Sequence, residues 1–122
     1  MRIAVPVSDG KVAKDFCSCQ QFAFVDVDVE EKLIHRVQYL DCPFDSVSLI
    51  SRWLCGMCVS IVIAHRMEDA LRGNFQKRRI EVFSQSPVVE PSEAIKEVLG
   101  YVYNAGKLTR IDAELGRNSR SF

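Results

Sequence analysis

Five cysteines and two histidines are the side chains of this 122-residue sequence best suited to metal or redox chemistry. The cysteines form three groups along the chain: Cys17-Ser-Cys19, Cys42 and Cys55-Gly-Met-Cys58. Thiolates and imidazoles are soft or borderline ligands that suit zinc, copper(I) and iron-sulfur species. Because a thiol pair can also be oxidised, the sequence points to a thiophilic metal site or to redox thiols.

Alternating and periodic hydrophobic residues predict the elements that position these side chains. A nearly continuous apolar run at residues 59–64 is too short for a membrane span and predicts a buried central strand. The other predicted strands are residues 2–7, 22–28, 33–40 and 79–83. The three predicted helices begin at Asp45 or Ser46, at Met67 and at Pro91, and the third continues to Gly106. A loop of about a dozen residues separates the first two strands, a length typical of functional loops.

These elements predict an α/β fold, with a five-stranded mixed sheet covered by three helices. Residues 22–40 form a hairpin, and the strands at 33–40, 59–64 and 79–83 run parallel through right-handed crossovers. The domain covers residues 1–108. The charged, Ser- and Arg-rich residues 109–122 are expected to form a flexible tail.

Strand direction decides which of the reactive side chains can meet. In an antiparallel hairpin, the start of the first strand and the end of the second lie at the same end of the sheet. A later strand parallel to the second also ends there. One end therefore gathers three thiols and an imidazole, from Cys17, Cys19, Cys42 and His65. Cys55 and Cys58 precede the central strand and lie at the opposite end, about 20 Å away.

The end that holds the three thiols and His65 is also the carboxyl end of the parallel strands, where open α/β sheets usually bind ligands. These side chains could hold zinc, copper(I) or an iron-sulfur species there. The alternative is that the thiols are ordinary loop residues and His65 is a solvated residue at a helix start. The strand ends lack the convergent carboxylates of a two-metal nuclease, and the sequence has no phosphate loop or nucleophile elbow. We therefore expect a protein that is not an enzyme.

Cys55 and Cys58 have the spacing of a redox or zinc motif, but their predicted position does not suit either well. In a thioredoxin-like motif the pair opens a helix, whereas here it closes one. A structural zinc site normally needs a second pair nearby, and none is predicted. Because cysteine is among the most buried residue types, we expect Cys58 to be a core residue and Cys55 a packed residue at the helix end, with use as redox thiols as the alternative.

Composition and charge narrow the functional classes. The chain has 16 Lys plus Arg and 16 Asp plus Glu residues, so no net charge attracts nucleic acid or anionic lipid. The amino terminus lacks the long apolar core and cleavage site of a signal peptide. We therefore expect a cytoplasmic protein, in which the cysteines are thiols or metal ligands and not structural disulfides.

The order of the elements and several short motifs resemble the dinitrogenase iron-molybdenum cofactor biosynthesis family (NifX-like), which has a ribonuclease H-like fold. The resemblance covers roughly residues 1–108. Its motifs are Met1-Arg-Ile-Ala-Val-Pro-Val7, Asp15-Phe16-Cys17 with Phe22, Cys42-Pro43-Phe44, and the closing segment from Ala94-Ile95 to Gly106-Lys107-Leu108. In the family the first loop typically reads His-Phe-Gly, and a glycine-rich turn usually follows the fourth strand. Here Asp15 and Cys17 replace that histidine and glycine, and His65-Arg66-Met67-Glu68 replaces the turn.

The resemblance implies a protein that binds or carries a metal-sulfur cluster and passes it to a recipient metalloprotein. Candidate cargoes are an iron-molybdenum or iron-sulfur cluster, a molybdenum-copper-sulfur species and zinc. We hypothesise that Cys17, Cys19, Cys42 and His65 replace the family's backbone contacts as direct ligands. Lys14, Asp15 and Arg66 would then orient the ligands or balance the thiolate charge. The alternatives are a thiol redox protein that uses Cys55 and Cys58, and a metal-free interaction module that has lost cluster binding.

Overall fold

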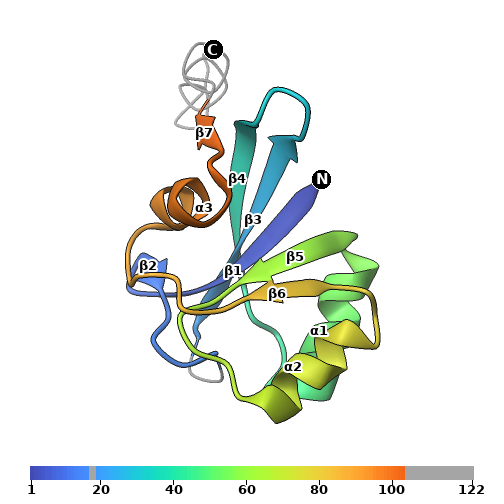
Figure 1. The fold of residues 1–122 in the computed structure, drawn as a ribbon. Helices are drawn as coiled ribbons and strands as arrows, with labels where there is room; N and C mark the ends of the chain where they lie inside the picture. The colour runs from blue at the N-terminus through green and yellow to red at the C-terminus, as the bar shows by residue number, and fades with distance from the viewer. Residues whose placement is uncertain (17–18, 104–122) are drawn as a thin grey trace.

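A mixed β-sheet runs through the computed structural model, which describes residues 1–16 and 19–103 (Figure 1). Within these residues the sheet has seven strands: β1 (Arg2–Ser8), β2 (Lys11–Val12), β3 (Gln21–Asp28), β4 (Leu33–Asp41), β5 (Val59–Ile63), β6 (Glu81–Phe83) and β7 (Val102–Tyr103). The helices are α1 (Val47–Gly56), α2 (Asp69–Gln76) and α3 (Pro91–Leu99). The predicted mixed α/β fold with three helices is confirmed, and the sheet contains two short strands, β2 and β7, in addition to the five predicted ones.

Strand pairing fixes the direction of every strand. The order across the sheet is β6-β5-β1-β3-β4-β7, and β2 pairs with β1. β1 is antiparallel to β3 and parallel to β5. β3 is antiparallel to β4, and β5 is parallel to β6. β4, β5 and β6 therefore point in the same direction, as predicted, but β1 and β3 lie between β4 and β5.

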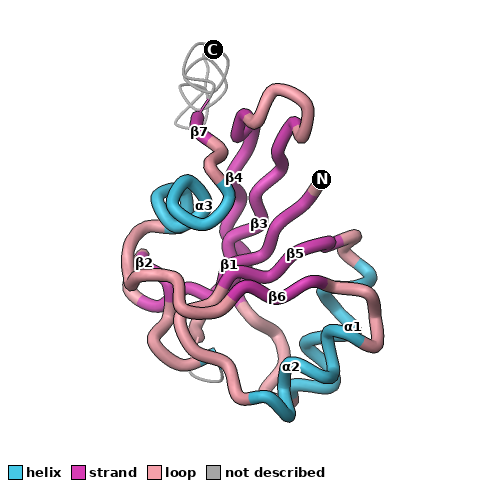
Figure 2. Tube along the Cα trace, viewed as in Figure 1, coloured by secondary structure: helices cyan, strands magenta, loops and turns pink. Residues whose placement is uncertain are grey.

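The sheet separates the core into two layers, and helices cover each face, α3 on one side and α1 and α2 on the other (Figure 2). The layer under α3 includes Ile3, Val5, Val25, Ile61, Ala94 and Ile95. The layer under α1 and α2 includes Ala4, Phe22, Phe24, Ile50, Leu54 and Phe75. Successive side chains of a strand point to opposite faces, which is why neighbours on β1 belong to different layers. No helix within the described ranges is long and apolar enough to span a bilayer.

The segment predicted as one long loop after β1 contains a tight hairpin. Ser8 pairs with Lys11 across a turn formed by Asp9 and Gly10, which have φ angles of 54° and 80°. Two consecutive residues with positive φ are typical of the type I′ turns that connect short hairpins, and Asp-Gly is a preferred sequence for them. The loop between β2 and β3 is therefore shorter than the predicted loop of about a dozen residues after the first strand.

The third helix is also shorter than predicted. α3 ends at Leu99 because Gly100 adopts a left-handed conformation, with φ 80° and ψ 10°. The prediction that this helix continues to Gly106 is wrong, since Val102 and Tyr103 form β7 and pair with Leu33 and Ile34. The predicted domain end at residue 108 and the predicted tail at 109–122 lie outside the described residues.

A strained residue connects α1 to β5, which lies next to the edge strand β6 and is not the central strand predicted from the sequence. The Cys58 N–H donates to the Cys55 carbonyl at 3.0 Å, and Cys58 has a φ angle of 65°. In this left-handed region a Cβ atom approaches the following carbonyl oxygen, so residues other than glycine pay a conformational cost. Helices commonly end with glycine at this position.

We predict that Cys58→Gly stabilises the protein relative to Cys58→Ala by about 1 kcal/mol. Both variants lack the thiol, but only alanine keeps the Cβ atom that strains the turn. Urea denaturation in reducing buffer would measure the two free energies of unfolding. Equal values would contradict the strain assigned to this position.

The turn between β3 and β4 depends on one carboxylate. The backbone N–H groups of Glu31 and Glu30 donate to Asp28 Oδ1 at 3.1 and 3.0 Å, and His35 Nε2 lies 3.7 Å from Asp28 Oδ2. These interactions, led by the Glu31 N–H, lower the pKa of Asp28 below its usual value. The ionised carboxylate therefore favours the folded turn, and this stabilisation is lost as the pH falls through the lowered pKa.

We expect Asp28→Asn to be less stable than the wild-type protein at neutral pH. Asparagine keeps an acceptor oxygen but not the charge. The difference should begin to shrink as the pH falls below the ordinary Asp pKa of about 4, and it should vanish below the lowered pKa of the folded state, where Asp28 is protonated in both states. Denaturant unfolding across the pH range would measure this difference. Glu30→Gln removes an exposed neighbouring charge and serves as the control; an equal effect in both variants would argue against the assignment.

Candidate functional site

Cys19 and Cys42 lie at the same end of the sheet, as predicted. Gln21 of β3 pairs with Asp41 of β4, and the Cys42 N–H donates to the Gln20 carbonyl at 3.2 Å. Both cysteines are partly buried and pack against the core layer of α1 and α2. The Cys42 thiol also donates to the Phe44 carbonyl at 3.2 Å. Cys17 lies outside the described residues, so the proposed three-sulfur arrangement stays a prediction.

His65 lies at this end of the sheet but on a more distant strand. It follows β5, and the backbone N–H of Gln85 donates to the His65 carbonyl at 2.9 Å. β1 and β3 separate β5 from β4. Adjacent strands are about 4.8 Å apart, so the backbones of His65 and Cys42 are separated by roughly 14 Å. The imidazole of His65 and the Cys42 thiol therefore do not lie side by side.

A hydrogen bond fixes the orientation of the His65 ring. Nδ1 lies 2.7 Å from the carbonyl oxygen of Ser86, which can only accept, so Nδ1 carries the proton. In the neutral ring the lone pair is then on Nε2. Histidines that bind metals usually donate their other N–H to a carbonyl or carboxylate in this way. Ser86 gives no signal in the sequence, because only the pairing of β5 with β6 brings it to His65.

Within residues 1–16 and 19–103, no three His, Cys, Asp or Glu side chains are close enough together to hold one metal ion. The described part of the predicted site is therefore a pair of thiols on the β3–β4 side and an imidazole on the β5 side. A single zinc ion in a structural site takes four ligands from one tetrahedron. Cys19, Cys42 and His65 are therefore too widely spaced to serve together as ligands of a single ion.

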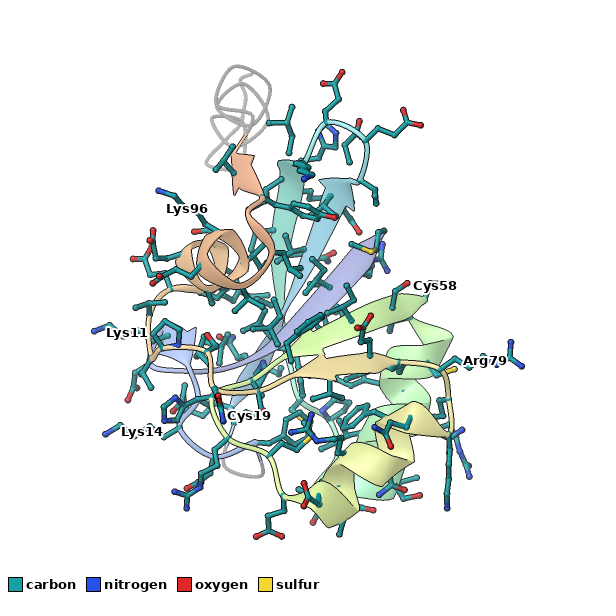
Figure 3. All side chains as sticks on the ribbon, in the orientation of Figure 1. Lys11, Lys14, Cys19, Cys58, Arg79 and Lys96 are labelled. Atoms are coloured by element: carbon teal, nitrogen blue, oxygen red, sulfur yellow. The ribbon has the colours of Figure 1, made fainter. Side chains whose placement is uncertain are left out.

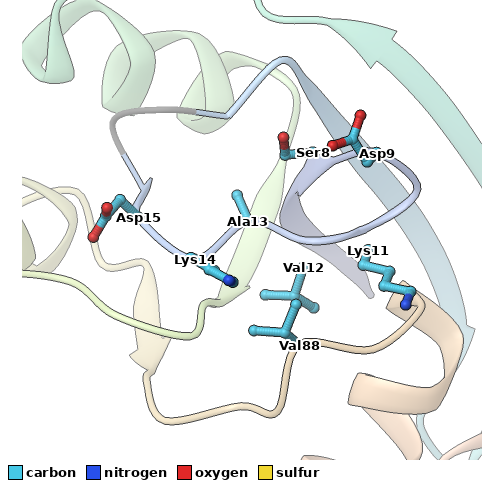
Figure 4. Close-up of a pocket in the computed structure, with 8 residues that line it drawn as sticks. All are labelled: Ser8, Asp9, Lys11, Val12, Ala13, Lys14, Asp15 and Val88. Atoms are coloured by element: carbon cyan, nitrogen blue, oxygen red, sulfur yellow. The ribbon is translucent and has the colours of Figure 1, made fainter.

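A polar cavity of about 530 Å³ opens beside the first loop (Figure 4). Its lining combines backbone of the β1–β2 hairpin with charged side chains: Ser8, Asp9, Lys11, Val12, Ala13, Lys14, Asp15 and Val88. Lys11 and Lys14 are exposed cations on this rim, and sequence reasoning missed Lys11 because the hairpin that positions it was not recognised.

An ion pair connects the first loop to the turn after β5. Arg66 Nε lies 3.4 Å from Asp15 Oδ1, so two of the residues expected to orient ligands are in contact. A second cavity of about 470 Å³ adjoins this pair and is lined by His65, Arg66, Met67, Arg72, Ser84 and Gln85. The Arg72 guanidinium is held there by Ser84 Oγ at 2.8 Å. Cationic side chains thus surround the carboxyl end of β5.

Cys55 and Cys58 lie at the opposite end of the sheet, as predicted. Figure 3 shows Cys58 there, away from Cys19. They precede Val59, which pairs with Arg2 at the amino end of β1, and Arg2 Nη1 donates to the Met57 carbonyl at 2.9 Å. Both thiols are free and exposed, so the prediction that they are packing residues is wrong. They cannot share a ligand with Cys19 or Cys42.

Comparisons with known proteins identify a family and related folds. Residues 1–101 match the family described as dinitrogenase iron-molybdenum cofactor. The crystal structure of the protein PH0822 has a TM-score of 0.72 and 23% sequence identity, over 82% of this chain and 91% of that one. The apo form of the orange protein from Desulfovibrio gigas has a TM-score of 0.63 and 18% identity, over 87% and 88% of the two chains.

A third structure, from Methanocaldococcus jannaschii and provisionally described as a dinitrogenase, has a TM-score of 0.61 and 17% identity, over 82% and 89% of the chains. At these identities the likeness shows the fold alone. A comparison with curated proteins gives no match.

We predict that the Asp15–Arg66 ion pair contributes little to folding, because its side chains are 59% and 75% exposed. A double-mutant cycle with Asp15→Asn and Arg66→Gln should give a coupling energy below about 1 kcal/mol that decreases with added salt. The more buried Arg2–Asp26 pair, at 33% and 34% exposure, provides the comparison. A coupling at Asp15–Arg66 larger than at Arg2–Asp26 would contradict the prediction.

Proposed function

Since the chain belongs to the dinitrogenase iron-molybdenum cofactor family, we propose that it binds a metal-sulfur cluster or a thiophilic metal as cargo and delivers it to a recipient metalloprotein. The protein acts as a carrier and carries out no reaction of its own. The free thiols of Cys42, Cys55 and Cys58 suit a reducing compartment, so we place this activity in the cytoplasm.

The backbone hydrogen bond from Cys42 to Gln20 is the observation that carries this proposal. It holds the loop segment with Cys19 against the end of β4, so that two thiols from distant parts of the sequence lie at one sheet end. Both thiols rest on the same core layer, which limits their motion without burying them completely. Thiolates so placed suit soft metals and metal-sulfur clusters.

The charges around this end of the sheet support an anionic cargo. Metal-sulfur clusters with thiolate ligands carry net negative charge, and the described cations Lys11, Lys14 and Arg66 line the cavities beside them. Asp9 and Asp15 also line the first cavity, and Asp15 pairs with Arg66, so attraction of such a ligand depends mainly on the exposed Lys11 and Lys14.

His65 offers a second point of attachment for the cargo, on the β5 side of the site. Its Nδ1–H is already used by Ser86, so Nε2 is the nitrogen available to a metal. With the thiols several strands away, an iron-molybdenum, iron-sulfur or molybdenum-copper-sulfur cluster suits these donors better than one zinc ion. Cys17, if it converges with Cys19, would add a third sulfur to the set.

Anaerobic reconstitution tests the proposal. The wild-type chain would be incubated with sulfide and iron, molybdate, copper(I) or zinc, desalted, and measured by elemental analysis and absorption spectroscopy. We expect the Cys19→Ala/Cys42→Ala variant to retain roughly tenfold less metal than the wild type, and Cys55→Ala/Cys58→Ala to retain an equal amount. His65→Asn keeps a donor for Ser86 but removes Nε2, so it should lower metal retention without lowering the melting temperature.

Equal metal content in the wild type and in a Cys17/Cys19/Cys42 triple alanine variant would overturn the site. If neither protein retains metal, the family fold serves as an interaction module without cargo. Loss of metal in the Cys55/Cys58 variant alone would move the site to the other end of the sheet.

A further inference from the structure

The turn that closes α1 brings two thiols into position for a disulfide. The Cys58 N–H donates to the Cys55 carbonyl at 3.0 Å. A chain reversal of this kind holds the first and fourth Cα atoms within about 7 Å, and disulfides join Cα atoms about 4.4–6.8 Å apart. Both thiols are free and exposed, so a small reactant can reach either one.

A fixed positive charge lies beside this turn. The Arg2 guanidinium donates from Nε to Asp26 Oδ1 at 2.9 Å and from Nη1 to the Met57 carbonyl at 2.9 Å. The hydrogen bond to Asp26 is the main cause that raises the pKa of Arg2, and the charge of the Cys58 thiolate adds to it. The guanidinium therefore lies close enough to interact electrostatically with a thiolate at Cys58, the form that reacts in thiol exchange.

The surroundings of the pair suit exchange better than metal binding. Within the described ranges no third His, Cys, Asp or Glu joins Cys55 and Cys58 to complete a metal site. A zinc ion held by Cys55 and Cys58 alone would lack half of its usual four ligands. The two thiols can satisfy each other by forming one covalent bond.

We propose that Cys55 and Cys58 form a reversible intramolecular disulfide by exchange with a low-molecular-weight disulfide of the glutathione type. The Cys58 thiolate attacks one sulfur of the small disulfide, whose S–S bond breaks and releases one thiolate that takes up the proton lost by Cys58. The Cys55 thiolate then attacks the Cys58 sulfur, and the second small thiol leaves with the proton from Cys55. Two protein thiols are oxidised, and one small disulfide is reduced to two thiols.

This activity is independent of the proposed cargo site. Cys19 and Cys42 lie at the other end of the sheet and take no part in either step. Failure of cluster binding would leave the exchange intact, and failure of the exchange would leave cluster binding intact.

Trypsin separates the pair from every other cysteine of the chain. Cleavage after Arg52 and Arg66 releases residues 53–66, which contain Cys55 and Cys58 only. The full-length protein would be equilibrated with defined ratios of reduced and oxidised glutathione, acid-quenched, alkylated, digested and analysed by mass spectrometry. We expect a peptide that has lost two hydrogens and resists alkylation, and that returns to the dithiol form when reduced glutathione is in excess.

Single variants identify the attacking thiol. Cys55→Ser should trap glutathione on Cys58, and Cys58→Ser should react more slowly through Cys55. In the Cys55→Ser background, Arg2→Gln should slow glutathione addition roughly two- to fivefold at low salt, with the difference shrinking near 1 M salt. Arg36→Gln, on the exposed side of β4, is the matched control and should leave the rate unchanged.

A peptide 53–66 that stays fully alkylated at every glutathione ratio would overturn the proposal. Mixed disulfides on both cysteines without an internal disulfide would also overturn it. An Arg2→Gln rate equal to that of Arg36→Gln would refute the role of the guanidinium, and a rate change that persists at high salt would assign Arg2 a structural role in place of an electrostatic one.

Discussion

The parallel pairing of β1 with β5 determines what meets at each end of this molecule. Because β1 is also antiparallel to β3, the ends of β1 and β5 lie beside the start of β3. These two pairings place Cys19 and His65 at one end of the sheet and Cys58 at the other. The same register divides the core, since a slip of one residue would move Ile3 and Ala4 into the wrong layers.

An aromatic cluster supports the end of the sheet that holds Cys19 and Cys42. The ring of Phe16 contacts those of Phe22 and Phe75, with centroids 5.7 and 5.4 Å apart. Trp53 contacts Phe22 and also Phe44, with centroids 5.8 and 6.2 Å apart. Edge-on ring contacts stabilise beyond simple burial. Phe16 lies in the first loop and Phe44 follows β4, so both loop segments near the thiols are anchored to a rigid layer.

Strand directions and helix positions are predictable from this sequence, because hydrophobic periodicity is a local signal. The order of the strands is not, since the insertion of β1 between β5 and β3 depends on long-range pairing. For this reason the sequence identifies the correct end for His65 and Cys42 but not their separation. Helical spacing at Val102 predicts a longer third helix, and the left-handed Gly100 overrides it. Asp9-Gly10 did carry a readable hairpin signal.

The outer edge of β4 has a consequence for how the protein meets other chains. β7 pairs with β4 at Leu33 and Ile34, and beyond them no strand among the described residues covers this edge. Exposed Arg36 and Gln38 occupy it, and Pro43 follows it. Charged side chains and proline discourage the addition of foreign strands, which protects an open sheet from aggregation. These side chains therefore disfavour extension of the sheet along the outer edge of β4 by a strand from another chain.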